Sequence, residues 1–169
     1  HPGNVFLAGE TVSIPLSPTL PSTSTEWRLL DDRRHLLRRA TLPSDTMGRR
    51  KPIHLGRLEI GWYRLELGTT NQPDQSWTSL AVLRRRSKPV PTDSPVAVDS
   101  AAAWFARNDS VQQKRLANLA ALAGVSWVRD RLRWGEIQPN PGDLKPLPTT
   151  YDTSADAHRD AGLQVLQVF

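Results

Sequence analysis

The chain contains no cysteine, which excludes disulfide bonds and cysteine-ligated metal sites. It also has no apolar run near the roughly 18 residues that a membrane-spanning helix requires, and no recognisable signal peptide. We therefore expect no membrane partner. The composition is compatible with a bacterial cytoplasm, or with an exported protein that has no disulfides.

Several chemical motifs are missing as well. No glycine-rich phosphate loop stands at a strand–helix junction, which disfavours a nucleotide-binding fold, and no Gly-x-Ser-x-Gly elbow is present. The histidines show no metal-ligand spacing; they are His1, His35, His54 and His158. We expect neither a metal site nor a cofactor.

The net charge of +5 is unevenly distributed. Residues 1–90 carry 14 Lys and Arg against 8 Asp and Glu, whereas residues 91–169 carry 8 against 9. Basic clusters occupy residues 33–39, 49–51 and 84–88, and such clusters can bind phosphates. Because they lie in three separate places without a nucleic-acid motif, we favour solvated strand faces, hairpin tips or a linker. Nucleic-acid binding stays the weaker alternative.

The first half of the chain has the period of β-strands. Apolar and polar residues alternate over residues 11–16 and 62–67, which indicates half-buried strands. Further strands are expected at 25–30, 36–41, 53–58 and 79–83, with a hairpin turn at 31–33. Short strands separated by turns predict a small antiparallel, Ig-like β-sandwich over residues 1–88.

Two local signals refine this half. Residues 58–63 resemble the tyrosine corner of Greek-key sandwiches, in which Gly61 would allow a tight turn and the Tyr63 hydroxyl would bond to upstream backbone. An ordinary strand containing an aromatic residue is the alternative. Residues 89–95 are rich in proline, which favours extended chain, and we place a linker and the domain boundary there.

Residues 96–169 alternate between strand and helix. An apolar run ends at Asp99, a helix capped by Asp109 ends at Gly124, and a strand at 125–129 turns charged at its end. A weaker helix at 152–161 precedes a last strand at 163–169. Residues 123–128 also match 161–166 in type, so we interpret the region as βα units of a parallel sheet. A doubly wound sheet or an eight-stranded barrel would each need more chain, and we expect the front end of a larger protein.

Residues 117–142 carry the most specific pattern: a helix ending in Ala123-Gly124, a strand ending in Val128-Arg129, then Trp134, Glu136 and Gly142. Tyr151-Asp152 and Gly162-Leu163 follow in order. This order resembles the second-strand region of clan A (β/α)8 glycoside hydrolases, the large retaining superfamily, and the resemblance covers about residues 95–169. It implies an N-terminal β-sandwich followed by the first three βα elements of a truncated TIM barrel.

The resemblance also suggests roles for particular residues. In that family the arginine at the place of Arg129 holds the catalytic nucleophile by charge-assisted hydrogen bonds. Trp134 would form part of a sugar platform, Asp99 would bond a sugar hydroxyl, and Trp104 with Phe105 would line the same cleft. The plainer interpretations are an Arg129 salt bridge to Asp130 or Glu136, packing of Trp134 under its loop, and structural roles for Asp99 and Asp130.

The two catalytic carboxylates of such enzymes are expected on the fourth and seventh strands, beyond residue 169, so no residue here is assigned as catalytic. The implied function is the N-terminal part of a retaining glycoside hydrolase acting on a poly- or oligosaccharide. Its partners would be the carbohydrate substrate and the rest of the barrel, and a secreted or periplasmic location is favoured. A non-catalytic carbohydrate- or partner-binding protein with a degenerate barrel is the alternative.

Overall fold

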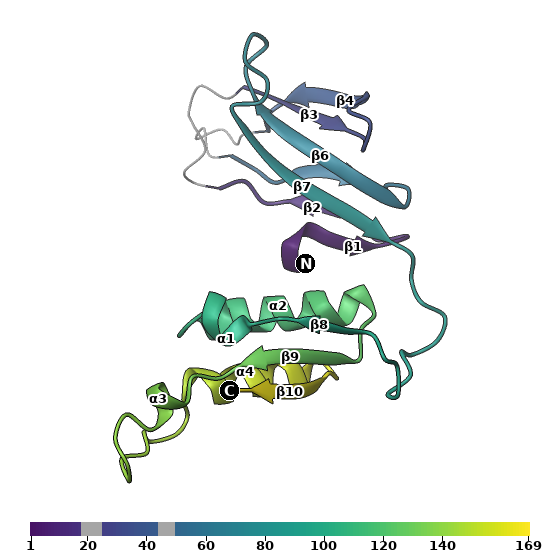
Figure 1. The fold of residues 1–169 in the computed structure, drawn as a ribbon. Helices are drawn as coiled ribbons and strands as arrows, with labels where there is room; N and C mark the ends of the chain where they lie inside the picture. Colours follow the sequence, from purple (N-terminus) through teal and green to yellow (C-terminus); the bar gives the residue numbers. More distant parts are fainter. Residues whose placement is uncertain (18–24, 44–49) are drawn as a thin grey trace. The chain divides into compact units, whose positions relative to one another are not determined.

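A computed structural model of the chain describes residues 1–17, 25–43 and 50–169 (Figure 1). The chain divides after Arg86 into two compact units, Gly3–Arg86 and Ser87–Phe169. The first unit is built of strands, and the second alternates strands with helices. The mixed β and α/β fold class expected from the sequence is therefore confirmed.

The strands of the first unit follow a short 3-10 turn at Pro2–Asn4. They are β1 (Val5–Leu7), β2 (Val12–Ile14), β3 (Glu26–Leu30), β4 (Leu36–Thr41), β5 (Ile53–Gly56), β6 (Gly61–Gly68) and β7 (Ser76–Leu83). One sheet has the strand order β1-β7-β6-β3-β4, and a second pairs β2 with β5. The pairs are antiparallel except β1–β7, which is parallel, so the antiparallel expectation is wrong for this edge strand.

Side chains from both sheets share one hydrophobic core. In β3, β6 and β7 alternate residues point inward, as period two requires, and Leu29, Leu65 and Leu80 are at most 1% exposed. The other buried members of this core are Phe6, Val12, Ile14, Trp27, Leu42, Ile53, Leu55, Tyr63, Leu67 and Val82. The opposite face of β6 carries Trp62, Arg64 and Glu66, which are polar or aromatic.

The tyrosine corner predicted from the sequence is present. The Tyr63 hydroxyl donates a 2.8 Å hydrogen bond to the backbone oxygen of Glu59, four residues upstream. The hairpin turn after β3 also forms as expected, because Asp31 Oδ1 accepts from the backbone N–H groups of Arg33 and His35. In the basic clusters, Arg49 lies outside the described residues.

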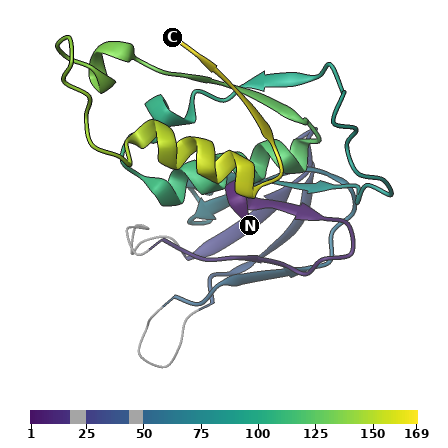
Figure 2. The ribbon, with the colours of Figure 1, turned by 90° about the horizontal axis from the view of Figure 1, so that it is seen from below.

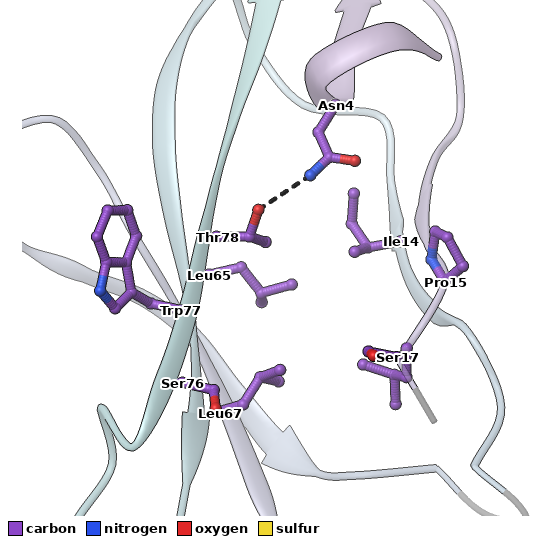
Figure 3. Close-up of a pocket in the computed structure, with 10 residues that line it drawn as sticks. Asn4, Ile14, Pro15, Ser17, Leu65, Leu67, Ser76, Trp77 and Thr78 are labelled. Carbon is purple, nitrogen blue, oxygen red and sulfur yellow. Dashed lines mark hydrogen bonds between the residues drawn. The ribbon is translucent and has the colours of Figure 1, made fainter. Parts of the chain in front are cut away.

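A cavity of about 310 Å³ opens between β2 and the β6–β7 pair (Figure 3). Ile14, Leu65 and Leu67 give it an apolar floor, and Asn4 donates a 3.1 Å hydrogen bond to Thr78 at its rim. Trp77 also borders the cavity, but Figure 3 shows its indole on the opposite side of β7.

The second unit contains β8 (Ala97–Asp99), α1 (Ala102–Phe105), α2 (Ser110–Ala123), β9 (Trp127–Arg131), α3 (Trp134–Ile137), α4 (Thr150–Asp160) and β10 (Gln164–Val168). Its sheet is parallel with the order β8-β9-β10, and Asp99, Arg129 and Leu166 lie in register. Helices α2 and α4 pack side by side (Figure 2), and α4 also contacts β10. Sequential parallel neighbours joined by helices are the arrangement that the repeated helix–strand pattern predicts.

The helix ends match the sequence signals. Asp109 Oδ1 accepts from the backbone N–H of Gln112 at the start of α2, and Gly124 takes φ 88° at its end. A capping box of Thr149 and Asp152 starts α4. Strand β9 is shifted by two residues from the expected 125–129: it begins at Trp127 and continues past Arg129 to Arg131, where β10 pairs with it up to Val168. Among the described residues, the helices are too short or too polar to span a bilayer.

Candidate functional site

The two faces of β9 differ in chemistry. Val128 and Asp130 are fully buried on the face that α4 covers, where the Ser154 hydroxyl reaches the Asp130 carboxylate. Arg129 and Arg131 alternate with them and therefore lie on the opposite face. Both arginines stand near the carboxyl end of the sheet, beside the end of β8.

Asp99, the last residue of β8, connects these arginines. Its Oδ2 accepts from Arg131 Nη2 at 2.6 Å and from Arg129 Nη2 at 2.9 Å. These bonds, with Arg131 first, lower the pKa of Asp99 below its ordinary value of 3.8. Asp99 is therefore a carboxylate near neutral pH. Arg129 pairs with Asp99 rather than with Asp130 or Glu136, so the plainer interpretation named the right kind of bond but the wrong partners.

Trp104 joins the same cluster from helix α1. Its ring lies 4.3 Å from the guanidinium carbon of Arg133 and 5.4 Å from that of Arg131. Both distances are within the range of cation–π attraction. The sequence candidates Asp99, Arg129 and Trp104 are thus brought together, with Arg131 as the shared contact.

A second cluster forms around Glu136 of α3. Its carboxylate accepts from the Tyr151 hydroxyl at 2.7 Å and pairs with Arg107 at 3.1 Å and Arg133 at 3.3 Å. The Tyr151 hydrogen bond, followed by the two arginines, lowers the pKa of Glu136 below its ordinary value of 4.5. Since an ionised carboxylate has no proton to donate, Glu136 is poorly suited to be a general acid here.

A cavity of about 340 Å³ adjoins this second cluster. It is lined by Arg107, Asn108, Glu136, Lys145, Pro146, Pro148, Thr149, Thr150 and Tyr151. The loops before α2 and before α4 provide most of these residues, so they lie on the side to which β8 and β9 point.

Trp134 takes a separate position. It is 54% exposed, its indole N–H donates to Gln138 Oε1 at 3.0 Å, and its ring lies 6.5 Å from that of Phe169. Among the described residues, no contact is found between the Trp134 side chain and the cluster of Asp99, Arg129, Arg131 and Trp104, which we call the Asp99 cluster. The ring is half open to solvent, so packing beneath its loop accounts for only part of its surface.

Asp130 belongs to a buried network. Ser154 Oγ donates to Asp130 Oδ2 at 2.5 Å, and His158 Nδ1 lies 2.8 Å from the Ser154 carbonyl oxygen. A carbonyl only accepts, so Nδ1 carries a proton, and in the neutral ring Nε2 accepts from the Ser100 hydroxyl at 3.0 Å. This network ties α4 to the sheet, which explains why Asp130 is buried.

Sequence reasoning missed Arg107, Arg131, Arg133 and Tyr151 as members of these clusters. For Arg131 the alternation of β9 was an available signal, because Arg129 and Arg131 share a face once the strand is extended. For the others no local pattern marks the contact. In the part of the chain that the structure describes, no group of three or more His, Asp or Glu side chains could hold a metal ion.

No protein-family model matches the chain. A solved family 39 glycoside hydrolase from Bacteroides cellulosilyticus WH2 is similar in fold, with a TM-score of 0.63, 20% identity, and coverage of 100% of this chain and 33% of that one. The mouse leukocyte-associated immunoglobulin-like receptor 1 ectodomain reaches a TM-score of only 0.34 at 13% identity, over 52% of this chain and 85% of that one. That score supports no argument.

Among curated proteins, transcription initiation factor IIB of Xenopus laevis is 31% identical over 90 residues, which are 53% of this chain and 28% of that protein. The chain thus spans about a third of the hydrolase and less than a third of the initiation factor. The findings support a loose relationship in fold to a glycoside hydrolase.

Proposed function

We propose that the chain is the N-terminal part of a retaining glycoside hydrolase that acts on a poly- or oligosaccharide. In this proposal residues 1–88 form an accessory β-sandwich, residues 89–95 a linker, and residues 96–169 the first three βα elements of a TIM barrel. The observation that carries the proposal is the cluster of Asp99, Arg129 and Trp104 at the carboxyl ends of sequential parallel strands, where TIM-barrel enzymes have their active sites.

The face of the parallel sheet opposite its helices would line the barrel interior. That face carries Arg129 and Arg131 beside Leu166, which is 55% exposed. In a closed barrel such side chains pack in layers against those of further strands. The fold similarity to the family 39 enzyme supports this arrangement.

The Asp99 cluster would position substrate and neighbouring groups. Oδ2 of Asp99 is occupied by two guanidinium groups, whereas Oδ1 has no hydrogen-bond partner among the described residues and could accept from a sugar hydroxyl. Arg129, always charged, would hold the nucleophilic carboxylate ionised and oriented. Trp104 and Trp134 would offer indole faces to pyranose rings. The acid/base and nucleophile themselves would come from later strands, about 5–5.5 Å apart.

The proposal is tested with aryl glycosides. The 169-residue chain should release no nitrophenol from a panel of them, while a gene product that extends through the later strands should. In the longer protein, Arg129→Met should lower kcat more than it raises KM, and product analysis by NMR should show a retained anomeric configuration. Hydrolysis by the 169-residue chain alone would contradict the barrel interpretation.

A non-catalytic carbohydrate-binding protein is the alternative. It predicts that the longer protein binds oligosaccharides without hydrolysing them, and that glutamates are missing from the ends of its fourth and seventh strands.

Nucleic-acid binding is a weaker candidate, favoured by the basic clusters and by the sequence likeness to a protein named as a transcription initiation factor. It predicts duplex DNA binding that weakens steeply with salt.

A further inference from the structure

The outer face of the five-stranded sheet carries two exposed tryptophans. Trp62 of β6 is 43% exposed and Trp77 of β7 is 56% exposed. In the antiparallel register Trp62 lies opposite Ala81, and Trp77 lies opposite Glu66. Since Glu66 is four residues from Trp62, both indoles project from the same face, away from the core. We call this surface, formed by Glu26, Arg28, Trp62, Arg64, Glu66 and Trp77, the tryptophan face.

An ion-pair network holds the middle of the tryptophan face in place. Glu66 is only 4% exposed, and its two carboxylate oxygens accept from Arg28 Nη2 at 2.7 Å and from Arg64 Nε at 2.9 Å. The guanidinium of Arg64 lies 4.3 Å from the centroid of the Trp77 ring. A cation on one face of the indole fixes the ring and leaves its other face toward solvent. Trp77 is therefore oriented before any ligand arrives.

The tryptophan face and its edge carry only a small net positive charge. Glu26 and Glu66 offset Arg28 and Arg64, and both arginines are already engaged with Glu66. Arg39, opposite Arg28 on the edge strand β4, adds one positive charge. A nucleic acid or an anionic membrane would select a surplus of unpaired cations. Two aromatic rings between compensated charges instead suit a neutral ligand with both apolar and hydroxyl groups.

We infer that the tryptophan face binds an extended, neutral β-linked glycan by stacking pyranose rings on Trp62 and Trp77. The axial C–H groups of an equatorially linked chain form flat apolar faces, and its hydroxyl groups point sideways toward side chains such as Ser79, which lies opposite Arg64. The four-residue offset separates the two indoles by about 13 Å along the strands. That distance exceeds one sugar ring, so the ligand is an oligosaccharide. This binding does not depend on the proposed hydrolase activity.

The test is to titrate the 169-residue chain with cellohexaose and with xylohexaose. Binding is measured by isothermal titration calorimetry and by the change in tryptophan fluorescence. We expect binding of at least one of them, weakened about tenfold or more by Trp62→Ala or Trp77→Ala, because large aromatic contacts dominate such interfaces. The double variant should not bind. Trp77→Tyr should retain most of the affinity, since a stacking ring remains.

The matched control is Ile60→Ala, which removes an exposed apolar side chain just before β6 and should leave affinity unchanged. Circular dichroism of each variant checks that the sheet is intact. Three results would overturn the inference: no binding of either hexasaccharide, equal binding by the double variant, or equal affinity for maltohexaose, whose curved chain does not present one flat face to both rings.

Discussion

The two units fill their interiors with different side chains. The first unit buries large apolar residues from two sheets, among them Leu29, Leu65 and Leu80. The second buries mostly small or polar ones between sheet and helices. These are Ala101, Ala102, Ala103, Ala106, Gln113, Ala117, Ser126, Val128, Asp130, Tyr151, Ser154, Ala157, His158 and Leu163.

The open face of the parallel sheet completes the contrast. Leu166 on this face is 55% exposed, whereas Leu29, Leu65 and Leu80, on the inner face of the larger sheet in the first unit, are at most 1% exposed. Burial of apolar side chains stabilises a fold without requiring a particular bonding geometry. A hydrogen bond between buried polar groups stabilises it only while both partners are in place. We conclude that the first unit is held together by packing and the second by specific hydrogen bonds. Substitutions that remove a buried apolar side chain from the first unit, or a buried hydrogen bond from the second, test this conclusion.

The largest effect is expected from Leu65→Ala in the first unit. Leu65 is fully buried, and removing a buried leucine side chain costs about 2–5 kcal/mol of unfolding free energy. Hydrogen exchange resolved by peptide should show lost protection in β3, β6 and β7 and unchanged protection in α2 and α4. Leu37→Ala, at a 47% exposed position, is the control and should change little. Equal loss of protection in both units would mean that their stabilities are not separate.

The next effect is expected from Asp130→Ala in the second unit. The variant leaves the buried Ser154 hydroxyl without its acceptor, at a cost of about 1–3 kcal/mol. Protection should fall in α4 and β9, with the first unit unchanged. Asp156→Ala, which breaks an exposed pair with Arg159, serves as the control and should have little effect. A neutral Asp130→Ala would show that the buried network contributes nothing to stability.

Much of the fold could be predicted from sequence because local signals and burial agree. Asp109 and Gly124 bound α2 as their capping chemistry requires, and Tyr63 forms its corner. The parallel pairing of β1 could not be predicted, since three residues carry no usable period. The need for glycine at position 68 could not be predicted either. Any larger residue is excluded there, because a Cβ would lie 2.0 Å from the backbone oxygen of Gln72.

The candidate site was harder to predict than the fold. Strand ends could be located, which placed Asp99 and Arg129 near one another. The hydrogen-bond partners of these residues depend on which face of the strand each side chain occupies. In a charged run such as 129–131, the buried and exposed positions are both charged, so the sequence does not show which residue points inward. Contacts between distant loops, such as Tyr151 with Glu136, follow only from tertiary packing.

A smaller effect is expected from Tyr63→Phe. The change removes one hydrogen bond and leaves the backbone oxygen of Glu59 unpaired, which should lower the unfolding free energy of the first unit by about 0.5–1.5 kcal/mol.

Tyr151→Phe is the matched change in the second unit. There the pKa of Glu136 should rise toward 4.5, measured by carboxyl NMR, because its leading hydrogen bond is gone. No rise would mean that Arg107 and Arg133 alone set that pKa.

The smallest effect is expected from Asp99→Asn, and it should depend on pH. Arg131 and Arg129 lower the folded-state pKa of Asp99, so its ionised form stabilises the fold above the ordinary value of 3.8, and this stabilisation is lost as the pH falls through the lower folded value. The unfolding free energies of wild type and variant should therefore differ at neutral pH and converge below 3.8. About 1 M salt should reduce the difference, since the groups are exposed to solvent. A difference that persists at low pH would mean that Asp99 acts through hydrogen-bond geometry rather than through its charge. The exposed bonds of Asp99 would then stabilise the second unit in the same way as the buried network of Asp130.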